Sequence, residues 1–350
     1  MLKSDPAVSN SIRRLVCVGR WIAIGLAWLI IFALCAWAEA ALYIDLPQSW
    51  QVPGAVGFAI VLAAILIAAR SRPLRMVLCL AGFAAVLVWW LSISPSNERA
   101  WQTDVDRTAW ADIVGDTVTI HNLRNFDYRT VSDYEPRWET RSYDLSQIRG
   151  VDTFLTFWGS PWIAHPIVSF QFATGEHVAF SIETRKVVGQ EYSALRGFFR
   201  QYELIYTVAD ERDVIRLRTN YRVGEEVYLY RTTATPEAAR DIFLDYLRSM
   251  NALHERPQFY NALTSNCTTN IRLHTSVASG PLPPWDWRLL LNGKSDEFAY
   301  QHGKLVSAGL SFDELKRRAH INEAARAADK APNFSDLIRV GRPGFVDHTW

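Results

Sequence analysis

HPIVSFQFATGEHVAFSI, residues 165–182, is the stretch that sets the fold class. Apolar and polar side chains alternate through Ile167–Phe172 and again through His177–Ile182, and Thr174-Gly175 lies between the two runs. A two-residue period is typical of strands that bury one face, and a glycine between two such runs is typical of a hairpin turn. The stretch therefore predicts two antiparallel strands.

The remaining elements are predicted outward from this hairpin. The patterns favour a strand at Thr117–Leu123, a second strand pair at Asp213–Thr219 and Glu226–Arg231, and helices at Glu191–Leu204, Pro236–Leu253 and Cys267–Val277. The second helix is the strongest prediction, because Thr235 can cap it and Pro236 suits its first position. Strand pairs followed by helices indicate an α+β domain with an antiparallel sheet.

The sharpest chemical feature is SNCTTN, residues 265–270, at the start of a predicted helix. A thiol at a helix N-terminus meets the partial positive charge of unpaired N–H groups, which favours the thiolate. The same N–H groups can hold an oxyanion. We therefore predict Cys267 as a nucleophile, with Asn266 either capping the helix or donating to the oxyanion. The alternative is that Cys267 is an inert, buried small side chain.

A catalytic thiol needs a base, and the hairpin offers one. His165 opens the first strand and His177 the second, so we expect His165 to take the thiol proton and His177 to orient its ring. Glu183, on the second strand, and Glu176 are the alternatives for the orienting role. Either histidine could instead be an ordinary rim or hairpin-tip residue. The cysteines form no zinc pattern, and no metal or organic cofactor is expected.

Three uncharged apolar runs precede this domain. Residues 21–38, 52–69 and 76–93 are each 18 residues long without a charge, about the minimum that spans ~30 Å of hydrocarbon as a helix. The sequence therefore divides into a membrane anchor, residues 1–94, and a globular domain, residues 95–350. The alternative for the first run, a cleaved signal peptide, is disfavoured by the two runs that follow it.

Flanking charges predict the orientation of the anchor. The tail before the first run is basic, with Lys3, Arg13, Arg14 and Arg20. The loop after the first run carries only the acidic Glu39 and Asp45, and the loop after the second run carries the basic Arg70, Arg72 and Arg75. The N-terminus is therefore expected in the cytoplasm, and the globular domain outside the inner membrane. Of four cysteines only Cys267 lies in that domain, so it has no disulfide partner there.

Composition excludes two other classes of protein. Of 350 residues 49% are hydrophobic, which excludes a disordered chain. The formal net charge is +1, so the chain lacks the basic footprint of a nucleic-acid binder.

Several motifs resemble a known family. An Asn-Cys pair opening a helix, preceded by a strand-borne histidine with a second histidine 12 residues later, resembles the circularly permuted NlpC-like thiol fold of lecithin:retinol acyltransferase. More closely, the chain is similar to the periplasmic domain named for Lnb, a bacterial lipoprotein N-acyltransferase. The stretches that carry this similarity are FWGSPWIAHPIVSF (157–170), SIETRK (181–186), ADERDVIRLRTNYR (209–222) and YNALTSNCTTNIRLH (260–274).

The resemblance implies a permuted papain-like fold and a thiol acyltransferase of the bacterial inner membrane. Cys267 would take an acyl chain from a phospholipid as a thioester and pass it to an amine, such as the N-terminal cysteine of a lipoprotein. In that setting Arg124 and Arg185 are candidates for holding the lipid phosphate, and Trp162 for entering the membrane interface. The alternatives are a cysteine hydrolase acting on cell wall or lipid, and a non-catalytic membrane-anchored scaffold.

Overall fold

A computed structural model describes residues 6–279, 286–289 and 291–345; within them, the side chains of residues 6–15, 267, 278, 279 and 289 are not described. The chain divides into two compact units. The first is Met1–Ser94 with Phe199–Gln201, and the second is Pro95–Phe198 with Tyr202–Trp350.

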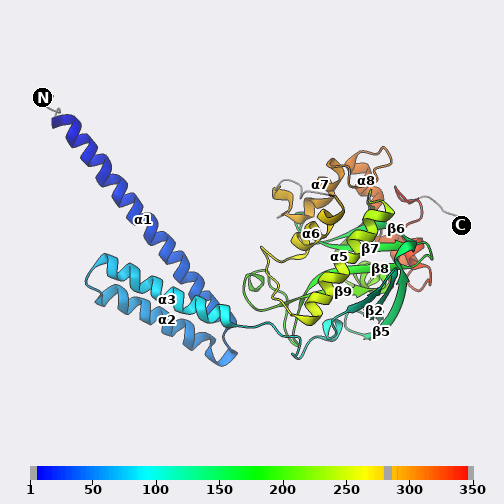
Figure 1. Ribbon diagram of the computed structural model, residues 1–350, viewed down its shortest axis with the longest axis horizontal. Coiled ribbons are helices and arrows are strands. Elements are labelled where there is room, and N and C mark those ends of the chain that lie inside the picture. The colour runs from blue at the N-terminus through cyan, green and yellow to red at the C-terminus, as the bar shows by residue number, and fades with distance from the viewer. Residues whose placement is uncertain (1–5, 280–285, 290, 346–350) are drawn as a thin grey trace. The chain divides into compact units, whose positions relative to one another are not determined.

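The first unit is built of three apolar helices, α1 (Pro6–Asp45), α2 (Gln48–Ala68) and α3 (Arg72–Ser92) (Figure 1). Each contains a window long and apolar enough to cross a membrane, as predicted. The first helix extends beyond the expected span at both ends, because no proline occurs between Pro6, its first residue, and Pro47. It packs against both other helices, and Trp90 Nε1 donates to Asp45 Oδ2 at 2.7 Å.

The second unit is an α+β domain with one large sheet, as predicted. Its strands run in the order β1-β2-β9-β8-β7-β6-β10, with β5 also paired to β2, and β2–β9 is the one parallel pairing in the described sheet. The strands are β1 (Trp110–Val114), β2 (Thr117–Arg124), β5 (Trp138–Asp144), β6 (Ile148–Trp158), β7 (Ala164–Phe172), β8 (His177–Arg185), β9 (Glu203–Ala209) and β10 (Glu225–Arg231). The predicted hairpin is β7–β8, at the centre of the sheet.

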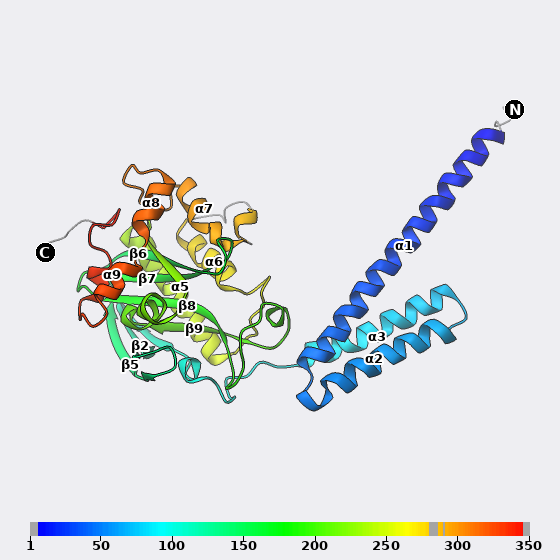
Figure 2. The same ribbon diagram turned by 180° about the vertical axis from the view of Figure 1, so that it is seen from behind.

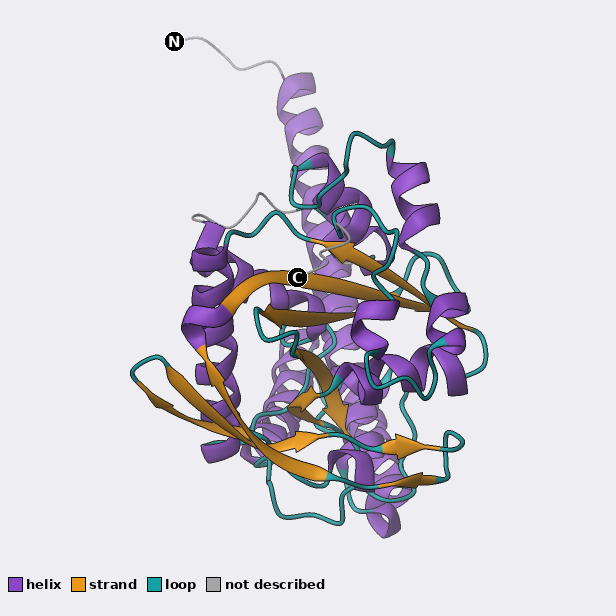
Figure 3. Cartoon of the chain, turned by 90° about the vertical axis from the view of Figure 1, so that its right-hand side faces the viewer, coloured by secondary structure: helices purple, strands orange, loops and turns teal. Residues whose placement is uncertain are grey.

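Helices cover both faces of this sheet (Figure 3). On one face lies α5 (Pro236–Glu255), capped by Thr235 as predicted, with α6 (Cys267–Ser279) beside it. Phe170 and Phe180 of the hairpin pack edge-on against Phe243 of α5. The opposite face is covered by α4 (Glu211–Arg216) and by α9 (Asn322–Ala327) and α10 (Phe334–Leu337), as the view from behind shows (Figure 2).

Smaller elements complete the domain. A two-stranded sheet pairs β3 (Asp127–Tyr128) with β4 (Tyr134–Glu135). Beyond α6 the chain forms α7 (Ser295–Gln301) and α8 (Phe312–Ala319). Short 3-10 turns lie at Thr103–Val105, Leu145–Gln147, Arg196–Phe198, Trp287–Leu289 and Asn292–Lys294.

Two predicted elements are wrong. Asp213–Thr219 is not a strand: α4 covers its first half and continues into a π-helix, η4 (Leu217–Tyr221). Asp210 caps α4 by accepting from the Arg212 N–H, a local helix signal that outweighs the apparent alternation. Glu191–Leu204 contains only the 3-10 turn at Arg196–Phe198 before β9 begins.

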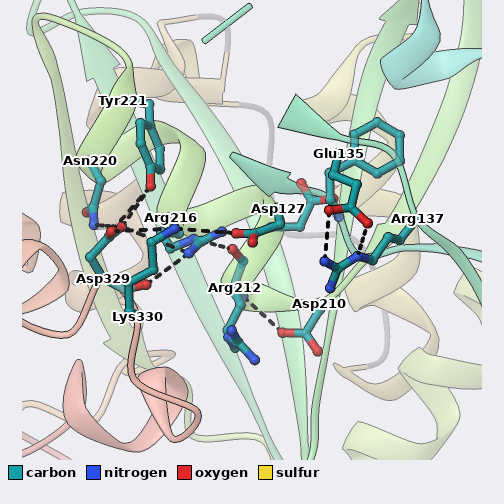
Figure 4. Close-up of polar contacts among 12 residues, drawn as sticks. Asp127, Glu135, Arg137, Asp210, Arg212, Arg216, Asn220, Tyr221, Asp329 and Lys330 are labelled. Atoms are coloured by element: carbon teal, nitrogen blue, oxygen red, sulfur yellow. Dashed lines mark hydrogen bonds and ion pairs between the residues drawn. The ribbon is translucent and has the colours of Figure 1, made fainter. Parts of the chain in front are cut away.

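Buried arginines tie the C-terminal helices to the rest of the domain. The almost fully buried Arg216 donates to Asp127 Oδ1 at 2.6 Å and to the Asp329 carbonyl at 2.9 Å (Figure 4). Arg339 forms ion pairs with Asp152 of β6 at 2.8 Å and with Glu211 of α4 at 2.6 Å. Removing one partner of such a buried pair would leave an uncompensated buried charge, which is costly. These contacts therefore hold the C-terminal helices against this face of the sheet.

Candidate functional site

The central strand pair opens at one end, where His165 lies. The pairing between β7 and β8 runs from the Gln171–His177 pair, next to the turn, to the Ile167–Ser181 pair, where it ends. Pro166 follows His165, and proline has no N–H to donate to a sheet ladder. The first residues of β7 remain paired with β6 alone, so the His165 end of the hairpin is splayed.

His165 contacts two side chains of the neighbouring strand. Its Nε2 lies 2.7 Å from Ser181 Oγ and 3.7 Å from Glu183 Oε1, and its side chain is only 14% exposed. Burial, with the charge of Arg218, lowers the pKa of His165 to about 3, although the Glu183 charge opposes this. The imidazole is therefore neutral at neutral pH.

Glu183 is held ionised beside this ring. Burial favours its neutral form, but the charge of Arg218 outweighs this and leaves the pKa of Glu183 well below its ordinary value. Arg218 lies on η4, and its Nη2 donates to Glu183 Oε1 at 3.1 Å while its Nη1 pairs with Glu225 at 3.3 Å. π-Helical turns recur at functional sites, and this one delivers a cation to the buried carboxylate.

The second part of the candidate site is the first turn of α6, which begins at Cys267 as predicted. Asn266 caps it: its Oδ1 accepts from the Thr269 N–H at 2.9 Å, and its own N–H donates to Thr269 Oγ1 at 2.9 Å. The Asn266 amide also donates to the Ala262 carbonyl at 2.7 Å. Of the two roles considered for Asn266, the structure shows helix capping.

The side chain of Cys267 lies outside the described part of the chain, but its neighbour Thr268 locates the helix start. Asn292 Nδ2 donates to Thr268 Oγ1 at 2.9 Å, and Asn292 Oδ1 accepts from the Ala164 N–H at 2.9 Å. One amide thus joins the residue after Cys267 to the residue before His165. The turn that carries Asn292 sits tightly against the β6–β7 loop, because a Cβ on Gly293 would lie 2.5 Å from the Pro161 carbonyl oxygen.

The sheet separates the two parts of the candidate site. His165 shares a face with Ser181 and Glu183, since alternate residues point to one side and paired residues share it. That face packs on α4 and η4, whereas α6 lies with α5 on the other face and contacts β7 and β8. The described contacts therefore place α6 and the His165 ring on opposite faces of the sheet, and they show no contact between the two.

His177 does not orient His165, which corrects the sequence-based expectation. It pairs with Gln171, six residues along β7 from His165, which is about 20 Å in a strand. Because the turn lies at Thr174-Gly175, the register of the hairpin brings Glu183, and not His177, opposite His165. Burial and the charge of Arg339 lower the pKa of His177 to about 3, and its Nδ1 lies 3.1 Å from the Gly175 carbonyl.

The two arginines predicted to hold a lipid phosphate are structural instead. Arg124 is buried and forms a forked ion pair with Asp213, with Nη2–Oδ1 at 2.9 Å and Nε–Oδ2 at 3.0 Å. Arg185 is also buried, and donates to the carbonyls of Val105 and Asp106 at 2.8 and 2.7 Å. Neither guanidinium faces solvent, so neither is placed to receive a lipid headgroup.

Trp162, predicted to enter the membrane interface, has an exposed side chain. It is 46% exposed in the β6–β7 loop, beside the half-exposed Trp287, with ring centroids 6.3 Å apart. Lys294 Nζ lies 5.5 Å from its ring. Trp162 also adjoins Ile163, which is 50% exposed, so the surface next to Asn292 is apolar and aromatic.

A buried polar cluster behind α6 was not predicted. His274 Nδ1 lies 2.7 Å from Asp245 Oδ2 of α5, and its Nε2 lies 2.7 Å from the Tyr206 hydroxyl of β9. Burial lowers the pKa of His274, while Asp245 opposes the shift. The cluster joins α6 to α5 and to the sheet, and so helps to fix the helix that begins at Cys267.

Sequence reasoning missed Ser181, Arg218, Thr268 and Asn292. Counting residues outward from Thr174-Gly175 would have placed Glu183 opposite His165. The same count would have placed Ser181 opposite Ile167, two residues nearer the turn and on the same face of the sheet. Nothing in the sequence pointed to Asn292 or Arg218, because each reaches the site from a distant segment. No cluster of three metal-ligating side chains occurs among the described residues.

Comparison with known proteins agrees with the predicted family. Residues 134–293 match the family model described as the Lnb N-terminal periplasmic domain. This part of the chain is thus similar to an Lnb-type periplasmic domain, and the matched region includes His165, Ser181, Glu183, Cys267 and Asn292. Comparisons with curated proteins and with solved structures found no match. Together with three apolar helices, the domain fits a membrane protein with a periplasmic C-terminal part.

Proposed function

We propose that the protein is a membrane-anchored thiol acyltransferase. The Cys267 thiolate attacks the ester carbonyl of a phospholipid, the carbon–oxygen bond breaks, and a lysophospholipid leaves with a proton from the base. An amine, such as that of a lipoprotein's N-terminal cysteine, then attacks the thioester, forms an amide, and releases the thiol. The donor and acceptor classes come from the family resemblance.

The observation that carries this proposal is the tie through Asn292 between Thr268 and Ala164. It holds a helix N-terminus that opens with a cysteine next to the strand end that carries a neutral imidazole. A helix start favours a thiolate and offers N–H groups to an oxyanion, and a neutral imidazole can accept a proton. We propose His165 as that acceptor, reached at the open end of β7–β8.

The anchor supports a lipid as the acyl donor. A domain linked to membrane-spanning helices meets phospholipid at a high effective concentration. We propose that the helices stand in the bacterial inner membrane with the N-terminus in the cytoplasm and the globular domain in the periplasm. The exposed Trp162 and Trp287 then supply aromatic rings of the kind that favour the membrane interface.

The test is direct detection of the thioester. Full-length protein in lipid nanodiscs is incubated with a phospholipid carrying an isotope-labelled acyl chain, and the Cys267 peptide is analysed by mass spectrometry. We expect a labelled adduct that an added diacyl lipopeptide removes, with the label recovered on its amine. Cys267→Ala should abolish transfer, whereas Cys17→Ser, at an exposed cysteine of α1, should leave it intact.

Other outcomes identify the alternatives. Free labelled fatty acid without an acylated amine would indicate a hydrolase. Release of cell-wall peptide, with no lipid product, would indicate a peptidase or amidase. No adduct, together with alkylation of Cys267 no faster than that of a free thiol, would support a non-catalytic scaffold and refute the proposal.

A further inference from the structure

Exposed apolar side chains gather on two loops of the α+β domain. Five of them, each between 39% and 69% exposed, form what we call the apolar loop surface: Val188, Tyr192, Leu195 and Phe198 of the loop between β8 and β9, and Leu263 of the loop before α6. The Ala262 N–H donates to the Gly197 carbonyl at 2.8 Å, so the two loops lie side by side (Figure 1). Apolar side chains that cluster in the open mark a contact surface.

The β8–β9 loop bonds its backbone polar groups inward. The buried Tyr202 hydroxyl accepts from the Ser193 N–H at 2.8 Å and donates to the Glu191 carbonyl at 2.8 Å. The Tyr192 ring stacks on Tyr202, with ring centroids 6.0 Å apart. The loop therefore has a defined conformation, and its exposed apolar side chains cover no core of their own domain.

One end of the β8–β9 loop continues directly into the membrane unit. Phe198 is followed by Phe199–Gln201, which group with the three apolar helices and not with the α+β domain. Within that unit, Gln201 Nε2 donates to Asp45 Oδ1 at 2.7 Å. Because Phe198 and Phe199 are consecutive residues, the apolar loop surface is covalently continuous with the membrane unit.

The other end of the loop is bound to the segment that leaves the third apolar helix. The Val188 N–H donates to the Ala100 carbonyl at 2.8 Å, and α3 ends at Ser92. The chain from Ser92 to Ala100 reaches at most about 29 Å, even when fully extended. Both ends of the loop are therefore held within a short distance of the bilayer that the apolar helices require.

We infer that the apolar loop surface docks into the lipid bilayer, on the side of the membrane where the α+β domain lies. Leucine, valine and phenylalanine side chains gain free energy by leaving water for the acyl chains, and tyrosine favours the level of the headgroups. Residues 186–198 carry two basic side chains, Lys186 and Arg196, against one acid, Glu191, which suits a surface of lipid phosphates. Continuity with the membrane unit favours lipid over a protein as the occupant.

Docking also brings lipid toward the candidate nucleophile. Leu263 lies three residues before Asn266, whose side chain caps the first turn of α6. A bilayer that receives Leu263 is therefore close to the start of the helix that opens with Cys267. This consequence rests on the proposed function, whereas the docking itself does not.

The test identifies what covers Leu195. Benzoylphenylalanine, a photoreactive residue, replaces Leu195 in the full-length chain, the membranes that contain the protein are irradiated, and the purified protein is analysed by intact mass spectrometry. We expect an added mass equal to that of a phospholipid. The same probe in place of Leu263 should give the same adduct, and it replaces the first probe if that one prevents folding.

Val114 supplies the matched control, because it is 76% exposed but lies far from the segment that follows α3. Its neighbour Asp116 pairs with Arg240, in the second turn of α5. The segment after α3 contacts the opposite end of that helix, since the Asn97 amide donates to the His254 carbonyl at 2.9 Å. These contacts are about 21 Å apart along α5. We expect the probe at Val114 to give at least about fivefold less lipid adduct than the probes in the apolar loop surface.

A charge placed in the surface should weaken the docking of its neighbours. With the probe at Leu263, Leu195→Asp should lower the lipid adduct about fivefold, because it removes apolar area that lipid would cover. Leu195→Met, which stays apolar, should leave the adduct unchanged. Equal adducts in these two variants would contradict docking through this surface.

The remaining outcomes also overturn the inference. Equal lipid adducts at Leu195 and Val114 would show only that the domain lies near lipid. A cross-linked second copy or another protein at Leu195 would mean that a protein covers the surface, and no adduct would mean that water does.

The Cys267→Ala variant separates this inference from the proposed function. Its lipid adduct at Leu195 should match that of the wild type, because docking needs no reaction. Failure to detect a thioester on Cys267 would refute the acyltransferase and leave docking intact, whereas loss of the adduct with a thioester present would refute docking alone.

Discussion

At the scale of single residues, His165 should make the stability of the protein depend on pH. Its pKa is about 3 in the folded protein and about 6.5 when unfolded, so the unfolded chain takes up a proton first as pH falls. The stabilisation is complete above pH 6.5 and is lost progressively toward pH 3. Between pH 7.5 and pH 5 we expect wild type to lose about 2 kcal/mol more stability than His165→Gln.

The measurement is chemical unfolding of the full chain in detergent at the two pH values, followed by tryptophan fluorescence. His177→Gln is the matched control, since burial also lowers the pKa of His177 to about 3, and it should flatten the pH dependence similarly. A His165→Gln profile parallel to wild type would mean that the ring is protonated or solvated in the folded protein.

Which residue types matter could be predicted at this scale, but not which of them meet. The spacing favours His177 as the partner of His165 and leaves Glu183 only as an alternative. The structure places Glu183 Oε1 3.7 Å from His165 Nε2, and His177 far along the hairpin. Arg124 and Arg185 looked like free cations, yet a distant carboxylate and two loop carbonyls occupy them. Such partners are set by tertiary packing, which local patterns do not encode.

At the scale of secondary-structure elements, Asn292 joins α6 to β7, and its loss should separate the two halves of the candidate site. Asn292→Leu removes both hydrogen bonds and leaves the Ala164 N–H without its acceptor, a cost of about 1–3 kcal/mol. We expect acylation or alkylation of Cys267 to fall at least tenfold, because a displacement of about 1 Å is costly to a reacting pair.

Thr268 supplies the matched pair of variants for this tie. Thr268→Val is nearly isosteric and removes the hydroxyl that Asn292 contacts, whereas Thr268→Ser keeps it. Thr268→Val should resemble Asn292→Leu in Cys267 reactivity, and Thr268→Ser should resemble the wild type. Reactivity of all three variants at the wild-type rate would show that the tie does not position the helix start.

Elements with strong local signals were predictable, and those with weak ones were not. Pro236–Leu253 carries a threonine cap, a first-position proline and a helical apolar period, and α5 forms there with nearly the same bounds. Asp213–Thr219 carries competing signals, since the same apolar residues fit an alternating strand or a capped helix. The short helix α4 and the π-helix η4 form here instead of a strand, because Asp210 caps the first turn of α4.

At the scale of the whole molecule, composition separates the chain clearly into apolar helices and an α+β domain. The three spans were predicted because hydrocarbon accepts only long uncharged helices, a constraint that acts on the sequence directly. The strand order was not predicted. Placing β9 between β2 and β8 brings together segments separated by some 80 residues of chain, and no local pattern records that pairing.

The orientation of the molecule in the membrane gives the last prediction. Basic residues flank the start of α1 and the α2–α3 turn, whereas Glu39 and Asp45 lie at the other end of α1. Because basic flanking segments favour the cytoplasmic side, we expect three crossings to place the α+β domain outside the cytoplasm. Alkaline phosphatase fused after Trp350 should be active and a cytoplasm-dependent fluorescent protein dark, with the opposite pattern for fusions in the α2–α3 turn.

Replacing Arg70, Arg72 and Arg75 by glutamate should weaken this preference for one orientation, because it removes the positive charge that retains the α2–α3 turn in the cytoplasm. An active cytoplasmic reporter at Trp350 in the unmodified chain would reverse the orientation and, with it, place the candidate thiol on the wrong side for a lipoprotein amine.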